Sequence, residues 1–192
     1  MSHHPTIALL PDAARIVTSM VGAVRPEQWA EPSPCAGWTV RDVLNHLVCE
    51  HLWAPDLLRG QTLEEVGDRY VGDLLGEDPV GSWRRAVSAS MIAWAQADPA
   101  ASVHTTVGPM AVDEYAHQML LDLTVHGWDI GRSAGLLYLP IPPAVDDALT
   151  YEAPRIREHA TAGIFASPVA YDGPDPFGRL LALLGRDPHW RA

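Results

Sequence analysis

Asp122 and His126 are the residues of this sequence best suited to chemistry. At about 100° per residue, a helix over this segment projects both side chains from the same apolar stripe as Tyr115, Met119 and Ile130. A buried carboxylate costs several kcal/mol unless it is protonated, paired with a cation or bound to a metal. An imidazole one helical turn away makes metal binding the sharpest of these three hypotheses.

Further ligands should come from a facing helix, because helical bundles build metal sites from side chains on facing helices. The predicted second helix, 39–59, offers His46, Glu50 and His51. Measured from Val40 at the centre of its apolar face, His51 projects at about 20° and His46 at about 240°. Helical geometry alone therefore slightly favours His51 and leaves both histidines open. Two imidazoles and a carboxylate suit zinc, and three ligands leave coordination positions free for water or substrate.

A polar network without metal is the alternative interpretation of this carboxylate and imidazole. Arg132 is available as its cation, and we expect Asp129 to accept a hydrogen bond from the backbone or from Arg132. We expect His51 to be a core or supporting imidazole and Glu50 to be supporting or solvated. Cys35 is expected to be an inert, buried thiol, with a reactive thiolate near a helix N-terminus as the alternative.

Helical periodicity dominates the chain and predicts an all-α fold. The expected helices cover residues 11–24, 39–59, 82–97, 112–132 and 144–159, with a short sixth helix at 177–184. Residues 60–78 should form short helical turns or an exposed excursion, and 102–107 a short extended piece. These elements predict a single domain over 1–192, an antiparallel four-helix bundle with C-terminal helical additions.

Local signals set the expected helix ends. Pro11 is placed in the first turn of the first helix, where a missing N–H is tolerated. Thr39 is expected to cap the second helix, with Asp42 completing a capping box. Ser82 is expected to cap the third helix. The fourth helix should be central, because it is apolar on most sides.

The composition indicates a water-soluble protein with a small-molecule ligand. The net charge of −11 disfavours nucleic acid and anionic membranes as partners. No run approaches the roughly 20 apolar residues of a membrane span, and no secretory signal opens the chain, so we expect a cytoplasmic protein. Cys35 and Cys49 are expected to be reduced thiols. A homodimer through an exposed helix face is a further hypothesis.

Three stretches resemble a known family. The sequence PCAGWTVRDVLNHL at 34–47 resembles the entry to the second helix of the metal-binding domain in mycothiol-dependent maleylpyruvate isomerases, members of the DinB-like superfamily of four-helix bundles. The sequence DLTVHGWDIGRSAG at 122–135 resembles that family's second ligand motif. The tail FGRLLALLGRDP at 177–188 is similar to that of actinobacterial-type members. The resemblance spans roughly residues 10 to 190.

This resemblance implies that His46, Asp122 and His126 bind the metal. The metal is expected to be Zn²⁺, with Ni²⁺, Fe²⁺ or Mn²⁺ as alternatives. The family further implies mycothiol as a co-substrate. Two departures stand out: the characterised isomerases have Glu where this chain has Asp122, and they carry a separate C-terminal domain for which 192 residues leave no room.

The predicted function is that of a metal-dependent transferase or isomerase that uses a mycothiol-type thiol on a small electrophile. The alternatives are a metal-binding sensor or interaction module without turnover, and a hydrolase that uses metal-activated water. A second group of polar side chains facing the metal would favour an enzyme over a metal-binding module without turnover. Its candidates from the sequence, as holders of an anionic substrate, are Arg84, Arg85, Tyr70 and Tyr151.

Overall fold

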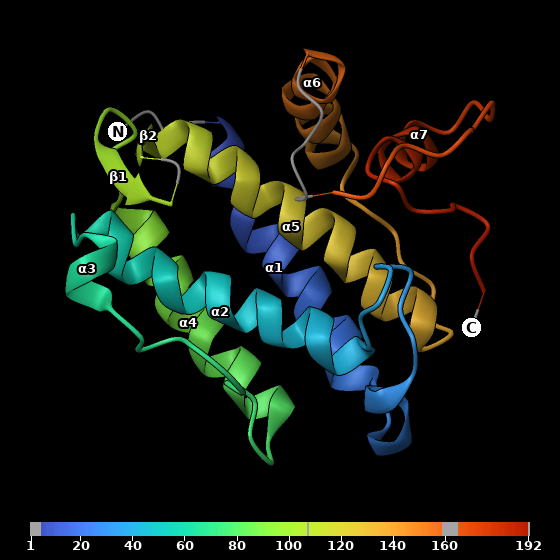
Figure 1. The fold of residues 1–192 in the computed structure, drawn as a ribbon, viewed down its shortest axis with the longest axis horizontal. Helices are drawn as coiled ribbons and strands as arrows, with labels where there is room; N and C mark the ends of the chain where they lie inside the picture. The colour runs from blue at the N-terminus through green and yellow to red at the C-terminus, as the bar shows by residue number, and fades with distance from the viewer. Residues whose placement is uncertain (1–4, 107, 159–164, 192) are drawn as a thin grey trace.

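Helices account for most of the computed structural model, which describes residues 5–106, 108–158 and 165–191 (Figure 1). The elements in this part of the chain are α1 (Pro5–Ala23), the 3-10 helix η1 (Pro26–Ala30), α2 (Val40–Leu58), α3 (Leu63–Val66), α4 (Pro79–Gln96), β1 (Ser102–Thr105), β2 (Gly108–Ala111), α5 (Val112–Ser133), α6 (Pro142–Glu158) and α7 (Pro176–Leu183). The prediction of a mainly helical fold is confirmed.

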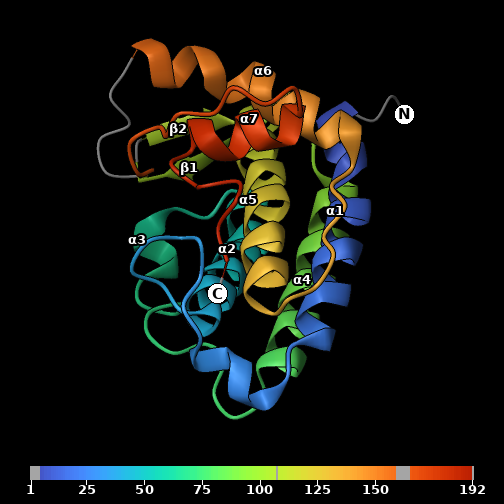
Figure 2. The ribbon, with the colours of Figure 1, turned by 90° about the vertical axis from the view of Figure 1, so that its right-hand side faces the viewer.

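Four long helices enclose the main apolar core (Figure 2). Helix α5 packs against α1 and α2, and α4 packs against the same two helices from the other side. Each helix directs its apolar stripe inward, because burial of apolar surface stabilises such packing. Fully buried members of this core are Leu10, Val17, Leu44, Leu47, Trp83, Leu120 and Leu123.

A second apolar cluster lies on the opposite side of α5. It is built from α5, α6 and the C-terminal α7, which cross near one another in Figure 2. Its buried members are Leu121, Val125, Trp128, Val145, Ala148, Phe177, Leu180, Leu181 and Leu184. Helix α5 is therefore buried on both sides, as its apolar sequence predicted, and the residues after 142 contribute to the packing around it.

The expected starts of α2 and α5 are confirmed, whereas those of α1 and α4 are wrong. At α2, Thr39 Oγ1 accepts from the backbone N–H of Asp42, whose carboxylate accepts from the N–H of Thr39. Helix α1 begins at Pro5, and Pro11 therefore lies inside it. Helix α4 begins at Pro79, because Asp78 caps it by accepting from the N–H of Gly81. A proline at the first helical position is favoured by its fixed φ.

Residues 60–78 run alongside α2 as an excursion that contains the short α3. Three side chains spaced four residues apart on α2 hold it. Arg41 pairs with Asp73, Asn45 donates to the carbonyl of Gly72, and the Cys49 thiol lies 3.5 Å from the carbonyl oxygen of Tyr70. The excursion thus covers one flank of α2 and leaves the flank toward α5 free for other contacts.

Two further segments differ from the expected elements. Within the extended piece expected at 102–107, Ser102–Thr105 form β1, which pairs with β2 in an antiparallel hairpin where Val103 faces Met110. Its partner strand β2 was not predicted, because Gly108 and Pro109 at its start are residues typical of turns. Helix α6 begins at Pro142, two residues earlier than expected, and its expected end at His159 lies outside the described residues.

Helix α1 is, among the described helices, long and apolar enough to cross a membrane by length and composition, with a mean hydropathy of 1.2. No such segment was expected from the sequence. Core helices of water-soluble proteins meet the same criterion. One face of α1 packs against α4 and α5 and buries Leu10, Val17 and Val21, so packing within the protein accounts for the apolar residues of that face.

Candidate metal centre

The three predicted ligands come together between α2 and α5. His46 projects from α2, and its Nε2 lies 3.2 Å from Oδ2 of Asp122 on α5. One turn further along α5, Nε2 of His126 lies 3.8 Å from Oδ1 of the same carboxylate. One ligand atom from each of the three residues lies within 4.8 Å of the other two. Each imidazole therefore approaches a different oxygen of the one carboxylate, and the two ring centroids are 4.9 Å apart.

Trp38 fixes the two imidazole rings from the loop before α2. Its ring is stacked on His126, with centroids 6.0 Å apart and an interplanar angle of 12°. It also contacts the ring of His46 at 5.3 Å. An indole has few rotamers and a large apolar surface, so this contact limits the motion of both rings and shields one side of the site from water.

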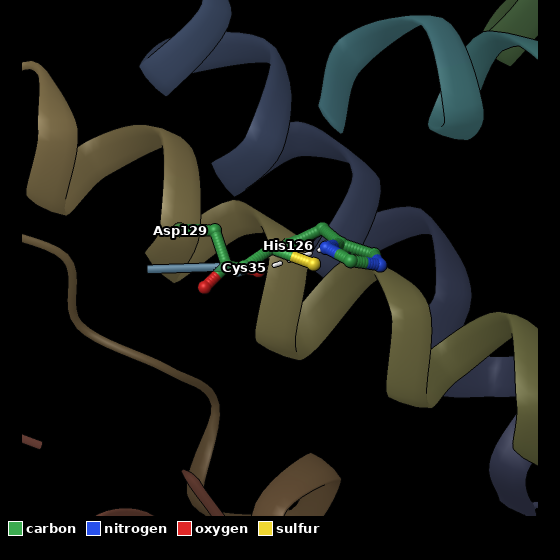
Figure 3. A group of neighbouring side chains, drawn as sticks. All are labelled: Cys35, His126 and Asp129. Atoms are coloured by element: carbon green, nitrogen blue, oxygen red, sulfur yellow. Dashed lines mark hydrogen bonds and ion pairs between the residues drawn. The ribbon is translucent and has the colours of Figure 1, made fainter. Parts of the chain in front are cut away.

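Asp129 orients His126. The Nδ1 of His126 lies 2.8 Å from Oδ2 of Asp129, whose side chain is fully buried (Figure 3). An ionised carboxylate only accepts hydrogen bonds, so the ring proton must lie on Nδ1. When the ring is neutral, Nε2 is then its unprotonated nitrogen, and this nitrogen faces Asp122. Carboxylates commonly hold metal-binding histidines in this way.

The expected partner of Asp129 was wrong. Arg132 instead donates to the carbonyl of Trp190, because its side chain extends toward the end of the chain. The cation beside Asp129 is Arg186, whose Nη2 lies 3.3 Å from Oδ2. Arg186 follows α7 and is separated from Asp129 by 57 residues. Helical periodicity gave no signal for a contact over that distance.

Electrostatics support a cation site. Burial raises the pKa of Asp122. The neighbouring His46, His126 and Arg186 lower this pKa by more than burial raises it, so the net shift is downward. Burial lowers the pKa of His46. The charge of Asp122, its hydrogen bond to His46 and the charge of Glu50 together outweigh burial, so the net shift of the His46 pKa is upward. No described arginine forms an ion pair with Asp122. A divalent cation therefore suits this group of two nitrogens and an ionised oxygen.

The centre is accessible from solvent. The side chains of His46 and Asp122 are 28% and 24% exposed, whereas that of His126 is 8% exposed. Fully enclosed ligands are typical of structural metal sites, whereas open positions are typical of catalytic ones. The exposure of two of the three ligands therefore indicates a site that a small molecule could reach.

His51 lies away from this centre, so the slight preference for it from helical angles was wrong. Its ring is fully buried, its Nδ1 lies 2.8 Å from Oγ of Ser90, and its edge packs on Trp83. Burial lowers the pKa of His51 to about 3, which keeps it neutral. The centre of the apolar face of α2 is turned toward α4, whereas His46 lies on the flank that faces α5.

Glu50 and Tyr115 are further polar residues on the two helices that carry the ligands, Glu50 four residues after His46 on α2 and Tyr115 seven residues before Asp122 on α5. Burial, with the charge of Asp122, raises the pKa of Glu50 to about 7. The Tyr115 hydroxyl is buried, interacts electrostatically with Glu50 and Asp122, and has no hydrogen-bond partner among the described residues. From the sequence, Tyr115 was expected only as a member of the apolar stripe. Its place on the stripe of Asp122 was the signal that could have identified it.

The residues expected to hold an anionic substrate have other partners. Arg85 pairs with Asp78 and Ser82 on the surface of α4, and Arg84 is exposed on the same helix. The Tyr70 hydroxyl donates to the buried Asp56, and Tyr151 donates to Glu114. The structure therefore does not bring these four residues together at the centre.

Replacing Glu50 with glutamine should stabilise the metal-free protein at pH 8 but not at pH 4. Below its ordinary pKa of 4.5, Glu50 is protonated in both folded and unfolded chains. Between 4.5 and about 7 the unfolded chain releases the proton and the folded chain keeps it, so stability falls as pH rises. We expect a gain of roughly 2 to 3 kcal/mol at pH 8.

Urea unfolding of Glu50→Gln and the parent protein in the presence of a chelator, at both pH values, measures this difference. Glu64→Gln, at an exposed carboxylate of α3, is the matched control and should have little effect at either pH. An equal effect of Glu50→Gln at pH 4 and pH 8 would contradict the burial of an ionisable Glu50.

The comparison with protein families agrees with this geometry. A model of the mycothiol maleylpyruvate isomerase N-terminal domain matches residues 10–131, more than half of the chain. The matched range contains His46, Asp122 and His126. Neither the search of curated proteins nor that of solved structures finds a match. The chain belongs to the family of the mycothiol maleylpyruvate isomerase N-terminal domain.

Proposed function

We propose that this protein binds one divalent metal ion through Nε2 of His46, the carboxylate of Asp122 and Nε2 of His126. The convergence of these three ligand atoms within 4.8 Å is the observation that carries the proposal. Zn²⁺ suits two nitrogens and one oxygen best, and Ni²⁺, Fe²⁺ and Mn²⁺ accept the same ligands. We further infer that the four long helices form a DinB-like antiparallel bundle.

The proposed activity is a thiol-dependent transfer or isomerisation of a small electrophile. A divalent metal lowers the pKa of a thiol bound to it and so supplies a nucleophile at neutral pH. Family membership favours mycothiol or a related low-molecular-weight thiol as co-substrate. Such small substrates fit a cytoplasmic, acidic protein, which would be repelled by nucleic acid and anionic membranes.

The residues around the ligands support turnover over passive metal binding. In the metal-free protein the pKa of Glu50 is raised to about 7, and a bound cation would lower it, so Glu50 can act as a proton acceptor at neutral pH. The Tyr115 hydroxyl, buried and without a partner among the described residues, can donate to a polar atom of a ligand. Trp38 keeps water from one side of the two imidazoles.

A hydrolase is the second candidate, and Glu50 is the observation that favours it. A carboxylate beside an open metal centre can accept the proton of an attacking water as readily as that of a thiol. A metal-binding sensor or interaction module would need neither Glu50 nor the exposed faces of His46 and Asp122. The three proposals therefore differ in what occupies the open side of the centre.

Mycothiol, or a short analogue with the same thiol, should bind the zinc-loaded protein at least tenfold more tightly than the metal-free protein. Binding should release close to one proton per thiol, because the sulfur is deprotonated when a metal binds it. Isothermal titration in two buffers of different ionisation enthalpy counts that proton.

The S-methyl derivative of the same thiol is the matched control, because it cannot supply a thiolate and should bind weakly. Equal affinity for thiol and thioether, or equal affinity of the metal-loaded and metal-free proteins, would contradict thiol activation. Hydrolysis of a panel of activated esters and amides by the zinc-loaded protein would then favour the hydrolase.

A further inference from the structure

Arg186 reaches the metal centre from the C-terminal segment. Its side chain is buried, with Nη2 located 3.3 Å from Oδ2 of Asp129 and 3.5 Å from Sγ of Cys35. Nη1 donates to the carbonyl of Leu184. Arg186 lies outside the matched range 10–131, whereas all three proposed ligands lie inside it. The buried guanidinium is thus a contribution from a part of the chain that the family model does not cover.

The fold places Arg186 through the end of α7. Leu180, Leu181 and Leu184 are buried in the second apolar cluster, which α7 shares with α5 and α6 and which fixes the position of α7. Gly185 follows with φ of +78°, and a Cβ there would lie 2.7 Å from the backbone oxygen of Ala166. Only glycine fits this turn without strain. The N–H of Arg186 then donates to the carbonyl of Leu181.

The contacts form a line from Arg186 through Asp129 to His126. The side chain of Asp129 is fully buried, and a buried carboxylate without a cation is strongly destabilising. Among the described arginines, Arg186 is the one that forms an ion pair with it. The same Oδ2 atom accepts from Nδ1 of His126. The position of this oxygen therefore depends on both partners.

We propose that Arg186 is a positioning residue of the metal centre. It holds the Asp129 carboxylate in place, which keeps the ring proton of His126 on Nδ1 and presents Nε2 to the metal. The C-terminal segment thereby completes a site whose ligands come from α2 and α5. This inference rests on the proposed metal binding by His46, Asp122 and His126.

The contact of the Arg186 guanidinium with Cys35 also bears on whether Cys35 could bind a metal. Ligand atoms of Cys35, His126 and Asp129 lie within 4.8 Å of one another, a spacing that would suit a second metal (Figure 3). Arg186 contacts the sulfur of Cys35 and the carboxylate of Asp129 and supplies the positive charge there. Burial raises the pKa of the Cys35 thiol. The space beside Nδ1 of His126 is therefore occupied by the Arg186 guanidinium, and we place the metal beside Nε2.

Arg186→Gln should lower the affinity for zinc about 10- to 100-fold, the usual effect of losing a group that supports a ligand. In the metal-free protein, nitrogen NMR spectra of the imidazoles should show His126 changing from the Nδ1–H tautomer to a mixture. Arg186→Lys retains the charge and should recover most of the affinity. A purely structural role for Arg186 would change neither the tautomer nor the affinity of the folded protein.

Arg132→Gln is the matched control, because it removes the contact with Trp190 in the same segment without touching Asp129. It should retain the affinity and the tautomer. Equal losses in Arg132→Gln and Arg186→Gln, or an unchanged tautomer and affinity in folded Arg186→Gln, would overturn the proposal.

Arg186→Gln leaves the buried Asp129 carboxylate without its arginine and could fail to fold for that reason. A second variant therefore removes both charges. The double variant Asp129→Asn with Arg186→Gln should fold and still bind zinc at least tenfold more weakly. Wild-type affinity in this folded double variant would overturn the inference. Absence of zinc binding by the wild-type protein would contradict the proposed function instead, and the tautomer in the metal-free protein would still test Arg186.

Discussion

Replacing Asp122 with alanine should remove near-stoichiometric zinc from the purified protein, and His46→Ala and His126→Ala should do the same. Structural zinc sites with four ligands bind with about 10 to 16 kcal/mol, so one ligand accounts for roughly 3 kcal/mol, or a factor of about 100 or more. Elemental analysis after dialysis, followed by competition titration with a chelating dye, measures both the content and the affinity.

His51→Ala is the control for this set. Its imidazole lies on the same helix as His46 but contacts Ser90 and Trp83 in the core. We expect this variant to lose stability and retain zinc. Retention of full metal content by His46→Ala, Asp122→Ala or His126→Ala would exclude the altered residue from the ligands. Circular dichroism of each variant separates loss of metal from loss of fold.

Those parts of the centre that depend on one helix could be predicted from the sequence. Asp122 and His126 are four residues apart, so helical periodicity alone places them on one face. The capping box of Thr39 and Asp42 likewise depends on neighbouring residues and was found. Pro11 was misplaced because proline is compatible with more than one position near a helix start, and Pro5 begins the helix instead.

The parts that depend on packing between helices could not be predicted from angles. His51 is nearer than His46 to the centre of the apolar face of α2, yet that face meets α4. The choice of His46 required the family motif. Arg186 is held by the turn at Gly185 and by the packing of α7 in the cluster that it shares with α5 and α6, and neither is visible in the periodicity around Asp129.

Metal removal should leave the fold intact, because the stability of the protein and its metal affinity have different origins. The main core is built from α1, α2, α4 and α5 and contains fully buried Leu10, Leu44 and Leu120. A chain of 192 residues buries enough apolar surface to fold without a metal. Chelation should therefore lower the midpoint of thermal unfolding and preserve the helical circular dichroism.

The size of this effect should follow mass action. A ligand that binds only the folded state adds about 2.7 kcal/mol to the free energy of unfolding when its free concentration is one hundred times its dissociation constant. Leu120→Ala, at a fully buried position of α5, should cost about 2 to 5 kcal/mol in both metal-loaded and metal-free protein. Urea unfolding at two zinc concentrations separates the two contributions. A random-coil spectrum after chelation would show that folding requires the metal. Because the ligands bridge α2 and α5, that outcome would mean that the contact between these two helices depends on the ion rather than on the core.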